Sequence, residues 1–270
     1  MALTSAVNWW NKNREWQSGY PLNTPPEQFR TRLVRTMPFA STAILICCKL
    51  TVPHLFAEEG DPITITTESV VARMVQSNHT RDVQLRDYTS VRHYSLRNQR
   101  FDTRATMTVR MTYRFPGQKR FEVMEESGPP TVRKRVLRRM LESELEASRD
   151  VARRESTQIT PANYTFRLVG SETVSGRQCF VLQADPKTRN QFLFKGRLWV
   201  DSDDYAVTRI EGTPAQNPSI WLRKTTFVHR YEKFGPFWLA VSNESQTDVL
   251  VFGHTEVRIE YSNYRINEQE

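Results

Sequence analysis

Apolar and polar residues alternate strictly between positions 106 and 115, in the sequence TMTVRMTYRF. One face of an extended chain would carry Met107, Val109, Met111, Tyr113 and Phe115, and the other would carry threonine and arginine. A period of two residues with one polar face is typical of a half-buried antiparallel strand. We therefore predict a strand here, a turn at PGQ, a second strand in KRFEVMEE and a further strand upstream in YTSVRHYSLR.

The preceding segment has the helical period instead. Val70, Val71, Met74 and Val75 recur at helical spacing after two threonines, Thr66 and Thr67, either of which can serve as an N-cap. This pattern predicts a helix over about residues 66–79, with a possible continuation towards residue 85.

A second apolar stripe lies between residues 131 and 154. Its members are Val132, Val136, Leu137, Met140, Leu141 and Leu145. The first turns are basic and the middle is acidic, which is the reverse of the order that the helix dipole favours. We predict one helix over 131–154, and we expect packing of the stripe to stabilise it.

The remainder of the chain reads as strands and turns. NYTFRLVG and RQCFVLQAD flank one turn, GRLWVD and YAVTRIEG flank SDD, and two long strands meet near Gly235 and Pro236 before TEVRIEYSNYRI closes the chain. In all, the patterns indicate about ten strands and two helices, a mostly antiparallel α+β fold. Because no linker interrupts them, we predict a single domain over residues 58–270.

The most apolar window, residues 37–60, precedes that domain. Its uncharged run from Pro38 to Cys48 is 11 residues long, whereas a membrane-spanning helix needs about 20. Upstream arginines, this run and Ala57 before EEG are typical of a secretory signal within residues 33–57, cleaved near Ala57. An uncleaved anchor and a core segment are the alternatives. The first 36 residues lack any packing pattern, so we also expect translation to begin near Leu33, Val34 or Met37.

Charge and cysteine content narrow the choice of function. The net charge is +8, but residues 1–57 hold six basic and two acidic residues, so half of the excess lies in this extension. The body is only mildly basic, which argues against nucleic-acid binding. Of the three cysteines, only Cys179 lies beyond the apolar window. A single thiol forms neither an intrachain disulfide nor a zinc site, and we expect a buried structural thiol rather than a nucleophile.

One basic cluster is a candidate interaction surface. It lies at the start of the second predicted helix and consists of Arg133, Lys134, Arg135, Arg138 and Arg139. A solvated helix face is the simplest interpretation. Contact with an anionic membrane surface is the more specific alternative, and nucleic acid is the least favoured partner.

Catalytic motifs are missing from the sequence. The five histidines have no metal-ligand spacing, and no nucleophile elbow, Walker loop or dinucleotide fingerprint occurs. The acidic run Asp201–Asp204 lacks the Gly and Glu positions of a calcium loop, so we predict a hairpin turn. We expect no enzyme activity, metal or cofactor.

Aromatic and methionine residues on the predicted strands suggest a binding site of another kind. They form either the core between sheet and helices or the wall of an apolar cavity in a curved sheet. The candidate ligand-binding residues are Met107, Val109, Met111, Tyr113, Phe115, Trp199, Trp221, Phe227 and Trp238.

The order of elements resembles a known superfamily. The segments VSGRQCFVLQADPK and GRLWVDSDDYAVTRIEG, followed by FWLAVSNESQTDV and VRIEYSNYRIN, resemble the second half of the LolA/LolB/RseB-type proteins. The similarity covers about residues 60–268 and is greatest for a bacterial branch of outer-membrane lipoprotein-sorting proteins. It implies an unclosed half-barrel of about ten strands with two or three helices on its concave side.

The resemblance also implies a function. Proteins of this type hold acyl chains or lipidated peptide on the concave face, and LolA-like carriers gate it with a buried arginine. Arg110 and Arg114 lie on the polar strand face, so no position in this sequence matches that arginine. Cys48 lacks the preceding small residue of a lipidation site, which departs from a LolB-like acceptor.

We therefore expect a periplasmic, non-enzymatic carrier or sensor whose partners are acyl chains or lipoproteins. The first alternative is an RseB-like regulatory module that binds a protein partner in envelope stress signalling. The second is an envelope hydrolase, for which the sequence offers no nucleophile and base.

Overall fold

The computed structural model describes residues 65–217, 222–251 and 253–267, which belong to one compact unit. The expectations about the signal, its cleavage near Ala57, the translation start and Trp221 lie outside the described residues. The single domain over 58–270 stays a prediction.

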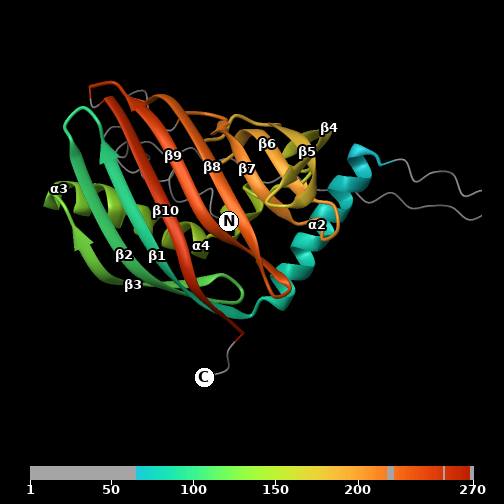
Figure 1. Cartoon of the computed structure of the whole chain (residues 1–270), viewed down its shortest axis with the longest axis horizontal. Coiled ribbons are helices and arrows are strands. Elements are labelled where there is room, and N and C mark those ends of the chain that lie inside the picture. Colours follow the sequence, from blue (N-terminus) through green and yellow to red (C-terminus); the bar gives the residue numbers. More distant parts are fainter. Residues whose placement is uncertain (1–64, 218–221, 252, 268–270) are drawn as a thin grey trace, which may run out of the picture. The chain divides into compact units, whose positions relative to one another are not determined.

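Ten antiparallel strands form one sheet in the order β3-β2-β1-β10-β9-β8-β7-β6-β5-β4 (Figure 1). Their bounds are β1 Asp87–Asn98, β2 Thr103–Arg114, β3 Gln118–Ser127, β4 Tyr164–Val174, β5 Arg177–Pro186, β6 Phe194–Asp201, β7 Val207–Pro214, β8 Leu222–Phe234, β9 Phe237–Val249 and β10 Gly253–Ile266. The last strand, β10, pairs with the first, β1, while β3 and β4 remain the two edges. This open, mostly antiparallel sheet confirms the predicted fold class and the half-barrel that the resemblance implies.

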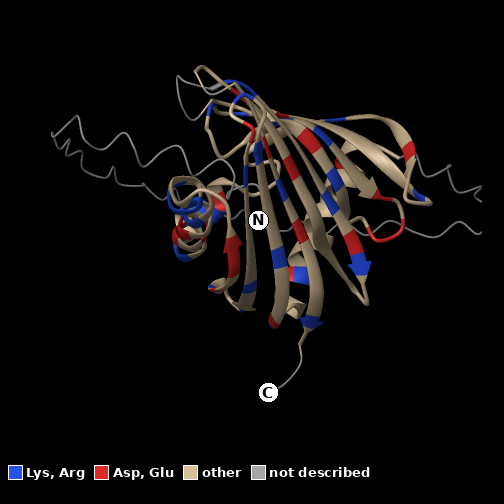
Figure 2. Ribbon diagram, turned by 60° about the vertical axis from the view of Figure 1, so that its left-hand side comes forward, with Lys and Arg blue, Asp and Glu red and all other residues tan. Residues whose placement is uncertain are grey.

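The alternation in β2 has the predicted result. Met107, Val109 and Met111 are fully buried, and the intervening Arg110 is exposed. Basic and acidic residues are interspersed along the strands (Figure 2), as expected where one side of each strand meets water.

The first predicted helix is α2, Thr67–Gln84, and its continuation towards residue 85 is confirmed. Thr66 is its N-cap. The backbone N–H of Ser69 donates to Thr66 Oγ1 at 3.2 Å, and the N–H of Thr66 donates to Ser69 Oγ at 3.1 Å. These reciprocal bonds satisfy two backbone donors that a helix terminus otherwise leaves unpaired.

The prediction of one continuous helix over 131–154 was wrong. The segment divides into α3 (Pro130–Val132), a π-helical turn η2 (Arg133–Leu137), α4 (Arg138–Arg149) and α5 (Val151–Ser156). Asp150 ends α4 in an extended conformation, and its carboxylate accepts from the N–H of Arg153 at 3.0 Å to cap α5. Leu145 is only partly buried, and Glu144 takes the buried position beside it.

Both helical segments pack on the same face of the sheet. A row of directly paired residues crosses eight strands in register: Met107, Tyr94, Ile259, Asn243, His229, Ile210, Leu198 and Leu182. Directly opposed residues in antiparallel strands have side chains on the same side. We call this the central row.

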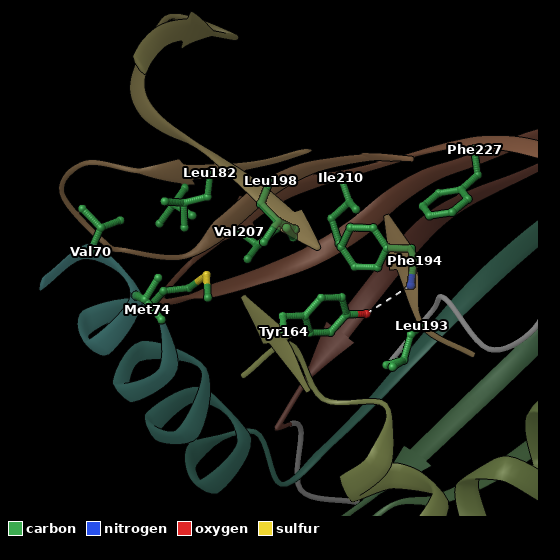
Figure 3. Close-up of a cluster of buried hydrophobic side chains, with 13 residues drawn as sticks. Val70, Met74, Tyr164, Leu182, Leu193, Phe194, Leu198, Val207, Ile210 and Phe227 are labelled. Atoms are coloured by element: carbon green, nitrogen blue, oxygen red, sulfur yellow. Dashed lines mark hydrogen bonds between the residues drawn. The ribbon is translucent and has the colours of Figure 1, made fainter. Parts of the chain in front are cut away.

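Each end of the central row belongs to a separate core. The α2 cluster lies between α2 and the sheet (Figure 3) and comprises Val70, Val71, Met74, Tyr164, Leu182, Ala184, Leu193, Phe194, Leu198, Val200, Val207, Ile210 and Phe227. The α4 cluster lies under η2 and α4 and comprises Tyr94, Leu96, Ala105, Met107, Val109, Leu137, Met140, Leu141, Ile259 and Tyr261. The helices therefore cover one face of the sheet over two distinct cores.

The opposite face of β5 and β6 has its own small cluster. Cys179 packs there with Val181 and Trp199, which confirms the buried thiol. At the adjoining turn the Asp201 carboxylate accepts from the N–H groups of Asp203 (3.0 Å) and Asp204 (2.8 Å). The acidic run is thus a hairpin turn, as predicted.

Candidate functional site

An ionic network is buried between the sheet and α4. Arg92 on β1 donates through Nη1 to both carboxylate oxygens of Glu144 on α4, at 2.9 and 3.1 Å. Lys119 on β3 donates through Nζ to Glu144 Oε1 at 2.5 Å. The exposed fractions of the three side chains are 5% for Arg92, 5% for Glu144 and 8% for Lys119. The network therefore joins two strands to the helix with less than a tenth of each side chain exposed to water.

The cations hold Glu144 in its ionised form. Burial alone raises the pKa of a carboxyl group, because the charged form loses its hydration. Here Arg92 and Lys119 outweigh burial and lower the pKa of Glu144 to about 2. Glu144 is accordingly a carboxylate at any pH at which the protein would function.

Aromatic rings enclose the Arg92 guanidinium. Its Cζ lies 5.0 Å from the ring centroid of Tyr261 and 5.4 Å from that of Phe121. A cation over an aromatic face is attracted by the ring quadrupole, more strongly where water is excluded. These rings belong to β10 and β3, so Arg92 is held by strands on both sides of β1.

Three polar atoms on β1 are buried without a hydrogen-bond partner. They are Ser90 Oγ, Arg92 Nε and Tyr94 Oη, on successive positions of the same strand face. Tyr94 lies near the guanidinium, but the contact lacks hydrogen-bond geometry. Burial raises the pKa of Tyr94 to about 12, so its hydroxyl keeps its proton. Unpaired buried polar groups cost free energy and are uncommon, so three neighbours on one strand face mark an unusual site.

A second polar pair lies in the middle of the central row. Asn243 donates to the Tyr261 hydroxyl at 2.6 Å, while Asn243 Oδ1 and His229 Nδ1 are buried without partners. Burial lowers the pKa of His229 to about 3, so its imidazole is neutral. Asn243 and His229 thus separate the α4 cluster from the α2 cluster.

The structure distributes the predicted ligand-binding residues over several places. Met107 and Val109 lie in the α4 cluster, and Met111 is buried on the same face of β2. Phe227 lies in the α2 cluster, and Trp199 lies with Cys179 on the opposite face of β6.

The other predicted aromatic residues lie outside both helix-covered clusters. Tyr113 stacks on Tyr88 with ring centroids 5.1 Å apart. Phe115 is 44% exposed. Trp238 donates from its indole nitrogen to Asp204 at 2.9 Å. Of the described candidates, therefore, only Met107, Val109 and Met111 meet on one part of the sheet, and a role for any of the nine in binding stays a prediction.

The basic cluster is partly neutralised. Arg133 and Arg138 both pair with Glu126, at 2.7 and 3.0 Å, and Arg139 pairs with Glu142 at 2.8 Å. Arg133 and Glu126 are partly buried, while Arg139 and Glu142 are exposed, and exposed pairs contribute little to stability. A contact of this helix with an anionic membrane stays a prediction.

Sequence reasoning missed Arg92 and Glu144, although a signal for both was present. In YTSVRHYSLR, Arg92 shares the period-two face of Tyr94 and Leu96. Glu144 follows Met140 and Leu141 at helical spacing. Arg92 thus lies among the apolar positions of a strand, and Glu144 lies among the apolar positions of a helix. Such a pattern is typical of a buried ion pair, because burying a single unpaired charge costs too much free energy.

Among the described residues, no group of histidine, cysteine and acidic side chains has an arrangement that could hold a metal ion. Within the same ranges, every helix is too short or too polar to span a membrane.

The class that these features define is structural: over the described residues the chain is an open antiparallel sheet with helices on one face, which is the architecture that the resemblance to the LolA/LolB/RseB-type proteins implies. A family model described as "-like: Uncharacterized protein" matches residues 146–269. The comparison with curated proteins gave no match.

Among solved structures, a DUF1329 family protein from Desulfovibrio piger is 14% identical with a TM-score of 0.40, over 77% of this chain and 95% of that chain. A putative outer membrane lipoprotein-sorting protein domain from Vibrio parahaemolyticus is 15% identical with a TM-score of 0.39, over 73% of this chain and 92% of that chain. A LolA superfamily protein from Nitrosomonas europaea is 11% identical with a TM-score of 0.34, over 76% of this chain and 96% of that chain.

Proposed function

We propose that this protein is a non-enzymatic, periplasmic binding protein that holds an acyl chain of a lipid or lipidated protein between its sheet and α4. The observation that supports this most directly is the buried Arg92–Glu144–Lys119 network inside the α4 cluster. A permanent core gains little from such a network, because apolar residues of similar volume are often at least as stabilising as a buried ion pair.

A buried ionic network is better suited to an interface between α4 and the sheet that opens and closes. When α4 leaves the sheet, Arg92, Lys119 and Glu144 recover their hydration, which partly offsets the loss of their mutual attraction. The exposed sheet surface would then consist of apolar side chains such as Met107 and Val109. Methionine adapts its shape to a variable ligand, and each buried CH₂ of an acyl chain contributes about 0.8 kcal/mol.

Lipid binding is tested by native mass spectrometry of the protein purified from its own periplasm, together with titration of a fluorescent fatty acid. We expect a bound lipid and saturable binding of the probe. Val109→Phe, which enlarges a residue that is 0% exposed in the α4 cluster, should weaken probe binding several-fold. Val169→Phe, the same enlargement at an exposed position of β4, should leave it unchanged.

A protein that is empty after purification and binds no fatty acid would refute the carrier function. In that case, retention of an inner-membrane anti-sigma factor in a pull-down would favour the regulatory module. Export is tested separately, by N-terminal sequencing of the mature protein: we expect a start near residue 58, after cleavage near Ala57.

A further inference from the structure

The charges of the buried network do not balance. Arg92 and Lys119 are cations and Glu144 is the only acidic member, so the three side chains sum to +1. A net charge held out of water is unfavourable unless another charge compensates it. An anion of higher charge than one carboxylate, such as a phosphate, would compensate the two cations more fully.

The unpaired atoms beside the network all have a hydrogen to donate. Ser90 and Tyr94 carry hydroxyl groups, and Arg92 Nε carries one N–H, each buried and without a partner. An anionic oxygen is the acceptor that forms the strongest bonds with such donors. The same position on β1 therefore offers positive charge and a row of free donors.

From these two observations we propose that the ligand is an anionic lipid, whose carboxylate or phosphate head group binds Arg92, Lys119 and the free β1 donors in place of Glu144. This inference rests on the proposed acyl-binding function and names the head group of that ligand. Glu144 is then an internal substitute for the ligand anion. Its carboxylate occupies the site while the lipid is absent and leaves with α4 when the lipid enters.

The exchange is balanced in charge. One carboxylate replaces another at the two cations, so the electrostatic change is small, while burial of the acyl chain supplies the driving force. Glu144 moves to water, where an ionised carboxylate is fully hydrated. A phosphate monoester would carry up to two negative charges and would compensate both cations.

The test compares three sixteen-carbon ligands: hexadecanoate, hexadecyl phosphate and the neutral hexadecanol. Dissociation constants are measured for wild type, Glu144→Gln, Lys119→Gln and the control Glu126→Gln, which removes a carboxylate paired with Arg133 and Arg138 outside the network. The readout is the ratio of affinities for the charged and neutral ligands. Near-ultraviolet circular dichroism establishes that each variant is folded.

We expect wild type to bind hexadecanoate at least tenfold more tightly than hexadecanol. Glu144→Gln should increase that ratio about tenfold, because the competing carboxylate is gone, and Lys119→Gln should reduce it about tenfold. Glu126→Gln should leave it unchanged. The opposite directions of two substitutions in one network cannot arise from a general loss of stability.

Two results would overturn the inference alone. The first is equal binding of charged and neutral ligands in every variant, which would leave acyl binding intact. The second is that inorganic phosphate or acetate displaces hexadecanoate as effectively as hexadecyl phosphate does. That result would indicate a site for free anions. Failure of all three sixteen-carbon ligands to bind would instead refute the proposed function.

Discussion

At the scale of single residues, Arg92 and Glu144 show how a charged pair is accommodated in an apolar interface. Each guanidinium–carboxylate contact is short, at 2.9 and 3.1 Å, and the rings of Tyr261 and Phe121 shield the cation. Yet Arg92 Nε has no acceptor. The guanidinium is thus paired through Nη1 and unpaired at Nε, so an anion that replaces Glu144 can accept one more hydrogen bond there.

The low pKa of Glu144 makes stability depend on pH. Its pKa falls from 4.5 to about 2 on folding, so the folded state binds this proton less readily than the unfolded state. The resulting stabilisation is complete above about pH 4.5 and is lost as the pH falls towards 2. Between pH 7 and pH 2 the loss amounts to about 3 kcal/mol.

Urea unfolding of wild type and Glu144→Gln between pH 7 and pH 2 measures this contribution. Glutamine does not titrate, so the difference in free energy of unfolding between the two proteins should shrink as the pH falls from about 4.5 to 2. A difference that stays constant over that range would contradict the assignment of the low pKa to Glu144.

At the scale of elements, β6 and β7 depend on a close approach of their backbones. Gly196 and Gly212 are directly paired, and a Cβ at position 196 would lie 1.9 Å from the carbonyl oxygen of Glu211. Gly196→Ala must therefore separate the two strands. We expect a loss of at least about 2 kcal/mol in the free energy of unfolding, measured with urea.

The neighbouring Lys195 provides the control. Its side chain is 67% exposed and pairs with Asp185 at 3.1 Å on the surface. Lys195→Ala should therefore cost less than about 1 kcal/mol. Equal effects of the two substitutions would show that the close backbone approach is not what position 196 requires.

At the scale of the whole molecule, the two cores differ in how their helix is held. Apolar side chains such as Val70 and Met74 join α2 to its cluster, and Arg73 adds a hydrogen bond to Tyr205 at an exposed position. In contrast, α4 contributes the buried charge of Glu144. Asn243 and His229 separate the cores in the central row. The proposed movement of α4 would therefore leave the α2 cluster packed.

Hydrogen exchange with and without hexadecanoate tests this difference. Amides of α4 should exchange faster when the ligand is bound, because the helix has left the sheet, while those of α2 and β8 should change little. Glu144→Gln should accelerate exchange in α4 even without ligand. Increased protection of α4 on binding would contradict an outward movement.

Local periodicity was sufficient to predict most elements. The alternation around Met107 and the helical spacing of Val70 and Met74 depend only on which face of an element is buried, and each was confirmed. The break at Asp150 was not predicted, because the apolar stripe before it is compatible with an unbroken helix. The helix ends there because the backbone of Asp150 is extended and its carboxylate caps α5.

The sequence by itself thus determined the strands, the first helix and the mostly antiparallel class, because short-range periodicity reflects burial directly. Only the tertiary structure decided which distant residues meet. Trp199 belongs to the opposite face of the sheet, and Arg92, Lys119 and Glu144 converge from β1, β3 and α4. Strand order and register set such contacts, and no local pattern encodes them. For that reason the sequence did not show which candidate binding residues lie together, and the buried network was found only in the fold.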